Sequence, residues 1–157
     1  MEAKIGIKKQ HLESVVEILS KALADEFLLY TKTRNAHWNI EGPDFHAMHK
    51  FFEDQYNQLD ETMDDVAERI RALGHYAPAT LASFLSLTHL SENSREKNDS
   101  QGFITELLAD HEGIIITLRE NINKIGNDYH DMGTSDFITG LMEIHEKMAW
   151  MLRAHLK

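Results

Sequence analysis

The sequence contains no cysteine, which excludes disulfides, thiolate zinc sites, iron–sulfur ligation and thiol catalysis. Any metal ion must therefore be bound by histidine and carboxylate side chains. No stretch offers about 18 consecutive apolar residues, and the first ten residues carry lysines without the apolar centre of a signal peptide. We therefore expect a soluble, cytoplasmic protein with no membrane partner.

Basic residues are scarce as well, with 16 Lys and Arg against 26 Asp and Glu and a formal net charge of −10. Such a molecule repels polyanions and attracts cations. The only basic cluster near the N-terminus consists of Lys4, Lys8 and Lys9, which offers little counterion release on a nucleic acid. We expect DNA binding to be weak or absent near neutral pH.

Proline is rare, since only Pro43 and Pro78 occur, and apolar residues recur every three or four positions. This pattern predicts an all-α protein. Four long helices are expected. The first covers about 8–35, the second has Pro43 in its first turn and ends at about 73, and the third runs from about 101 to Gly126. The fourth follows the capping residues 134–136. Gly74 suits a left-handed helix end. The 157 residues suffice for one domain, 1–157.

Charged residues are absent between Ala72 and Ser91, so this connection is expected to lie against the protein. Residues 79–87 within it can form a short amphipathic helix, and 91–100 read as a solvated loop. A long crossover between the second and third major helices predicts a four-helix bundle of ferritin-like topology.

Metal ligands inside such a bundle usually include Glu-x-x-His pairs, and none of the ten histidines here has Glu three positions before it. An ordinary intra-bundle di-iron centre is therefore not supported. Other candidate ligands remain: His37 near the end of the first helix, and His49, Glu53, Asp64 and Glu68 on the second. Imidazole with carboxylate suits iron, and zinc or manganese as competitors.

Residues four apart share a helix face, as do His49 with Glu53 and Asp64 with Glu68. The two pairs lie roughly 22 Å apart along one helix, so a single chain cannot close the site. Two antiparallel copies of this helix crossing near residue 57 would place His49 opposite Asp64 and Glu68 of the neighbour, twice over. From spacing alone, an ordinary charged helix face explains the pairs equally well.

Several motifs resemble the Dps family, the ferritin-like mini-ferritins. They are the run Asn35-Ala36-His37-Trp38-Asn39-Ile40-Glu41-Gly42, the spaced Phe45, His49 and Tyr56, and the segments Asp64-Asp65-Val66-Ala67-Glu68-Arg69-Ile70 and Leu73-Gly74. The resemblance covers essentially the whole chain, including the crossover helix and Trp150-Met151-Leu152. It implies a hollow dodecamer with ferroxidase centres at two-fold interfaces, formed by His37, His49 and residue 53 of one subunit and Asp64 and Glu68 of the other.

The resemblance also implies an activity. Fe²⁺ would be oxidised at these centres, preferably by hydrogen peroxide, before ferric mineral grows in the cavity, which protects against oxidative damage. Glu53 departs from the family pattern, because many relatives have Asp there. Trp38, beside His37, is expected either to intercept stray oxidising equivalents or to pack at the helix end.

Relatives build acidic pores on three-fold axes, and Asp128, Asp131 and Asp136 cluster at the matching turn. We favour Asp136 as the pore residue over a role in stabilising the helix N-terminus. His111 occupies a core position and His46 an exposed or accessory one. Two other functions stay open: a nucleoid-compacting protein in which ferroxidation is secondary, and a purely structural or signalling bundle.

Overall fold

A computed structural model describes residues 3–92 and 97–157 of the chain. Four long helices form the body: α1 (Lys9–Asn39), α2 (Phe45–Ala72), α4 (Ser100–Asn123) and α5 (Met132–Ala154). The short helix α3 (Leu81–Leu87) lies in the crossover, and one π-helical turn, η1 (Lys124–Asp128), follows α4. The described residues contain no strand. The all-α prediction and the extra crossover helix are therefore confirmed.

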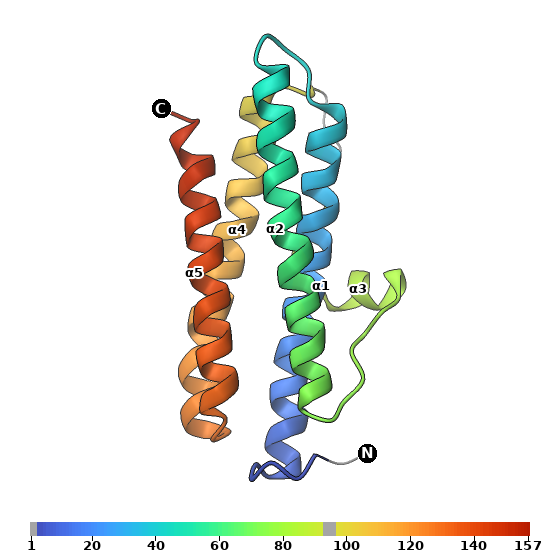
Figure 1. Cartoon of the computed structure of the whole chain (residues 1–157), viewed down its shortest axis with the longest axis vertical. Helices are drawn as coiled ribbons and strands as arrows, with labels where there is room; N and C mark the ends of the chain where they lie inside the picture. Colours follow the sequence, from blue (N-terminus) through green and yellow to red (C-terminus); the bar gives the residue numbers. More distant parts are fainter. Residues whose placement is uncertain (1–2, 93–96) are drawn as a thin grey trace.

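The helices form two antiparallel hairpins, α1 with α2 and α4 with α5 (Figure 1). The crossover climbs back along the outside of the bundle past α3, so α2 and α4 run in the same direction (Figure 1). One long connection between parallel second and third major helices is the ferritin-like topology that the sequence predicts.

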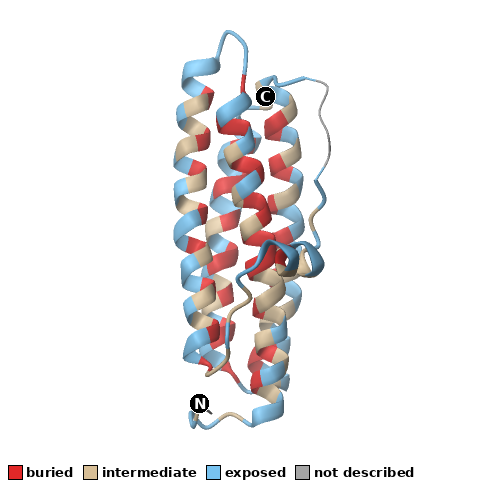
Figure 2. Cartoon of the chain, turned by 90° about the vertical axis from the view of Figure 1, so that its right-hand side faces the viewer, coloured by how far each residue is buried: buried red, intermediate tan, exposed pale blue. Residues whose placement is uncertain are grey.

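The core lies along the axis of the bundle, where buried residues face inward from every long helix (Figure 2). Each helix contributes one apolar stripe, because residues three or four apart share a face. Fully or almost fully buried examples from the four helices are Leu19, Phe52, Leu59, Leu107 and Ile138. Phe45 is an exception among the apolar residues of α2: it is the first residue of the helix and remains 45% exposed.

Two helix starts differ from their predicted positions. Pro43 lies in the turn before α2 rather than in its first turn, and Asp44 occupies the N-cap position. The cap of α5 is Asp131, whose side chain accepts the backbone N–H of Thr134 at 2.9 Å. Residues 134–136 therefore lie inside α5 and do not cap it. Gly74 has a φ of +83°, as predicted for a left-handed helix end.

The crossover lies only partly against the bundle. Phe84 of α3 stacks on Phe27 with ring centroids 4.4 Å apart, and the Thr88 hydroxyl donates to the Asp25 carboxylate at 2.6 Å. The outward side chains Tyr76, Leu81 and Leu85 are exposed. Residues 93–96 of the predicted loop 91–100 fall outside the described residues. No helix among the described residues has the length and apolar content needed to cross a membrane.

Candidate metal centre

Two histidines from neighbouring helices stack on each other near one end of the α1–α2 hairpin. His37 lies in the last turn of α1, and His49 lies one turn into α2. Their ring centroids are 3.7 Å apart at an interplanar angle of 20°. The tight turn between the helices brings the two rings together, although twelve residues separate them in the chain.

Each ring is held by the backbone of the other histidine. His37 Nδ1 donates to the carbonyl of His49 at 2.7 Å, and His49 Nδ1 donates to the carbonyl of His37 at 2.7 Å. Because a carbonyl only accepts, both Nδ1 atoms carry protons and both Nε2 atoms keep a lone pair in the neutral rings. A backbone carbonyl that fixes the tautomer and orientation of an imidazole is the usual outer support of a metal-binding histidine.

Aromatic rings and a cation surround this pair. Tyr56 meets His37 edge-on at 5.1 Å between centroids, and Phe45 stacks on His49 at 5.2 Å. The guanidinium of Arg34 lies 4.3 Å from the Tyr56 ring centroid and 4.9 Å from that of Trp38. Trp38 is 64% exposed, so within one chain it does not pack into the helix end.

Glu53 lies one helical turn beyond His49 and is held by a lysine. Lys50 Nζ and Glu53 Oε2 are 2.5 Å apart. The hydrogen-bonded ammonium lowers the pKa of Glu53 below its ordinary value, and the nearby His37 and His49 act weakly in the same direction. The same contact raises the pKa of Lys50. On one chain, His37 and His49 are thus in contact, and Glu53 lies one helical turn beyond His49 on α2.

Asp64 and Glu68 lie farther along α2 and are exposed. At 100° per residue, His49, Glu53, Asp64 and Glu68 fall within an arc of about 100° around the helix, so one face of α2 carries all four. Asp64 also lines a groove of about 450 Å³ whose opposite wall is the crossover, including Pro78. Among the described residues of the single chain, no three His, Asp or Glu side chains converge closely enough to hold an ion.

The three predicted pore residues have different surroundings. Asp128, at the end of η1, and Asp136, in the first turns of α5, are both exposed. Asp131 is 3% exposed; besides capping α5, it lies 3.5 Å from the guanidinium of Arg69 and accepts the Thr134 hydroxyl at 2.5 Å. Its observed partners are therefore structural ones.

The bundle centre contains a polar network that we did not predict. His145 Nε2 donates to Glu26 Oε1 at 2.5 Å, and the Nδ1 atoms of His145 and His111 share a hydrogen bond of 2.9 Å. The Thr62 hydroxyl donates to the other Glu26 oxygen at 3.1 Å. All four residues are buried, so His111 is the hydrogen-bonded core histidine that its position predicted. A signal existed, because each residue follows a core leucine by three or four positions.

Comparison with known proteins identifies the family of the chain. The Ferritin-like domain family matches residues 16–157. DNA protection during starvation protein 2 of Bacillus anthracis is 34% identical over 144 residues, which are 92% of this chain and 97% of the relative. The chain belongs to the Dps family of ferritin-like proteins.

Two further proteins are similar to this Dps chain over most of its length. A low temperature-induced protein of Nostoc sp. is 39% identical over 153 residues, covering 98% of this chain and 86% of the relative. The crystal structure of a Dps protein from Vibrio cholerae, described as a member of a broad superfamily of ferritin-like diiron-carboxylate proteins, superposes with a TM-score of 0.92 at 27% identity. That superposition covers 99% of this chain and 97% of the other.

Proposed function

We propose that this Dps chain is a ferroxidase and iron-storage protein that assembles into a dodecameric cage. Fe²⁺ is the substrate, hydrogen peroxide the preferred oxidant, and ferric mineral in the cavity the product, so the cage protects against oxidative damage. Membership of a family with ferritin-like diiron-carboxylate relatives supports iron as the metal. Zinc is expected to compete for the same histidine and carboxylate donors.

The observation that carries the proposal is the reciprocal hydrogen bonding of His37 and His49. Two imidazoles with fixed tautomers and available Nε2 atoms are prepared ligands, and Glu53 beside them adds a carboxylate. The remaining ligands are Asp64 and Glu68 of a second copy, presented by an antiparallel α2 across a two-fold axis. Carboxylates favour the ferric product by charge, and a sparse ligand set leaves a position for the oxidant.

Two further roles belong to the proposal. Asp136, with Asp128 as a weaker candidate, lines a three-fold pore in which repeated carboxylates concentrate cations before entry, and Asp131 caps the helix that carries Asp136. Trp38, exposed and in contact with Arg34, intercepts oxidising equivalents that escape the centre. The site is expected to act in the cytoplasm.

DNA binding is expected to be weak, although relatives carry names that refer to DNA protection. The net charge of −10 opposes association with a polyanion. A nucleoid-compacting role therefore predicts the opposite result in a gel-shift assay: tight, saturable binding at low salt would favour it over the ferroxidase as the main function.

The test begins with size in solution, because a monomer cannot assemble the proposed site. The purified cage is then loaded with Fe²⁺ anaerobically and given peroxide, and the ultraviolet absorbance of the ferric product is followed. We expect a fast phase that disappears in the His49→Ala, Asp64→Ala double variant while the size of the cage is unchanged. A fast phase of wild-type amplitude in that variant would refute the proposed centre.

A further inference from the structure

Lys50 is positioned to compete with a metal ion for Glu53. It directly follows the ligand candidate His49 in α2, and its ammonium lies 2.5 Å from Glu53 Oε2. This contact occupies one of the two carboxylate oxygens with which Glu53 could bind a metal ion. We propose that Lys50 is a latch on the metal centre: it holds the Glu53 carboxylate and must release it before Glu53 can bind an ion. The inference rests on the proposed function.

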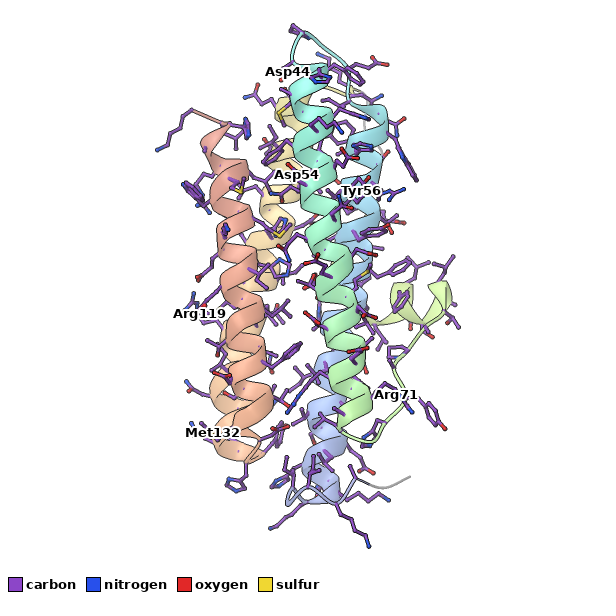
Figure 3. The ribbon with its side chains drawn as sticks, viewed as in Figure 1. Asp44, Asp54, Tyr56, Arg71, Arg119 and Met132 are labelled. Atoms are coloured by element: carbon purple, nitrogen blue, oxygen red, sulfur yellow. The ribbon has the colours of Figure 1, made fainter. Side chains whose placement is uncertain are left out.

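The latch can open because the lysine lies at the rim of the site. The side chain of Lys50 is 61% exposed and that of Glu53 is 31% exposed, so the ammonium can move into solvent without leaving a buried charge behind. Asp54, four residues after Lys50, is exposed and also favours the charged lysine. Figure 3 labels Asp54 in the half of α2 nearer its N-terminal end. The open state therefore has an alternative partner.

The latch makes the two halves of the centre unequal. His37 and His49 are oriented by backbone carbonyls and need no rearrangement to bind an ion. Glu53 must first lose an ion pair, and an ammonium left in place repels a divalent cation. Lys50 therefore weakens the ion position that uses Glu53 more than the position that relies on the histidines and the second copy. The two positions fill in sequence.

The test measures ion binding by the assembled wild-type cage and its variants, using Zn²⁺ as a redox-inert probe in isothermal titration calorimetry. Lys50→Met removes the ammonium and keeps the apolar stem. We expect its weaker class of Zn²⁺ sites to bind about tenfold more tightly, because both the ion pair and the repulsion are gone. Lys50→Arg, which keeps the charge, is expected to stay near the wild-type affinity.

Two controls isolate the latch. Lys21→Met removes an equivalent lysine, whose Nζ lies 3.0 Å from Glu17 Oε1 on α1, away from the site, and is expected to leave Zn²⁺ binding unchanged. Glu53→Gln is expected to remove the weaker class of sites, and adding Lys50→Met to this variant should then change nothing. Such non-additivity is the signature of two residues that act on each other.

The outcomes separate this inference from the function on which it rests. If His49→Ala, Asp64→Ala binds Zn²⁺ as the wild type does, the interfacial centre is wrong and the latch falls with it. If Zn²⁺ binding depends on those residues but Lys50→Met stays within about twofold of the wild-type affinity, the latch alone is wrong. Tightening in Lys50→Met that persists in the Glu53→Gln background also refutes it, because Lys50 would then act elsewhere.

Discussion

At the scale of single residues, the polar network in the bundle centre combines complete burial with hydrogen bonding between ionisable side chains. Glu26 and His145 are almost fully buried and hydrogen-bonded to each other. Glu26→Gln keeps the size of the side chain but removes its charge, which leaves a buried imidazole without its carboxylate. We expect this variant to lose about 3 kcal/mol in the free energy of unfolding, measured by chemical denaturation at fixed protein concentration.

The matched control lies on the surface. Glu146 pairs with Arg119 across α4 and α5, and both side chains are solvent-exposed. Glu146→Gln is expected to cost less than about 1 kcal/mol, because exposed ion pairs contribute little. Equal losses in the two glutamine variants would mean that the buried network adds nothing to an ordinary ion pair.

The same network makes stability depend on pH through His111. Burial, and to a smaller extent the neighbouring His145, lowers the pKa of His111 well below its ordinary value. As pH falls below about 6.5, the unfolded chain takes up a proton at this residue and the folded chain does not, so acid favours unfolding. His111 contributes up to about 1.4 kcal/mol per pH unit to this loss.

His111→Gln keeps a hydrogen-bonding group for His145 but cannot bind that proton. We expect the free energy of unfolding of this variant to fall less steeply between about pH 6.5 and pH 5 than that of the wild type. His46, which is exposed near the start of α2, provides the comparison, and His46→Gln should retain the wild-type slope. Parallel curves for all three proteins would contradict the assignment.

Residue types and spacing were sufficient to nominate His37, His49 and Glu53, and the fold brings the two histidines into contact. They were not sufficient to find Lys50 or the Glu26–His145 pair. Both involve charged residues, which a sequence assigns to the solvated face unless a partner is known. The partner of Glu26 is His145, which lies on another helix 119 residues away in the chain. The partner of Lys50 lies within one helical turn, but whether the two side chains meet depends on their rotamers.

At the scale of elements, the start of α5 carries two aspartates with different expected roles: Asp131 is structural, and Asp136 is the candidate pore residue. Asp131 caps the helix and contacts Arg69 of α2. Asp131→Ala is expected to lose about 2 kcal/mol in the free energy of unfolding, because it removes the cap and the ion pair together. Asp136→Asn should change stability by less than about 0.5 kcal/mol, since Asp136 is exposed.

Iron uptake by the assembled cage tests Asp136, whose substitution is expected to change uptake and not stability. If Asp136 lines a pore, Asp136→Asn slows the entry of Fe²⁺ while the cage keeps its stability. Wild-type uptake by this variant would mean that Asp136 is an ordinary surface residue and does not line a pore.

Element types were predictable and some boundaries were not. Periodicity alone identified four long helices and the crossover helix, because each must bury one stripe. The start of α5 was misplaced because several capping residues occur in a row and any of them can accept a helix N–H. The π-helical turn after α4 had no sequence signal beyond Gly126, where a Cβ would lie 3.1 Å from Met132 Sδ and from Ser135 Oγ. The glycine permits the start of α5 to approach this closely.

At the scale of the whole molecule, the proposed centre differs from most active sites in needing two copies of the chain. One face of α2 carries histidine and Glu53 near one end and the carboxylates Asp64 and Glu68 near the other. A two-fold axis therefore uses each chain twice, once for each half of a site. A site confined to one chain and a site shared by two chains predict different behaviour when variants are mixed.

Cages assembled from equal amounts of His49→Ala and Asp64→Ala chains provide this test. In a mixed pair, one site carries both substitutions and the other carries neither, so random pairing leaves about a quarter of the sites intact. We expect co-refolded or co-expressed cages to regain about a quarter of the wild-type fast ferroxidation amplitude, although each variant alone has none. If every site were contained in one chain, all chains in the mixture would remain defective and no amplitude would return.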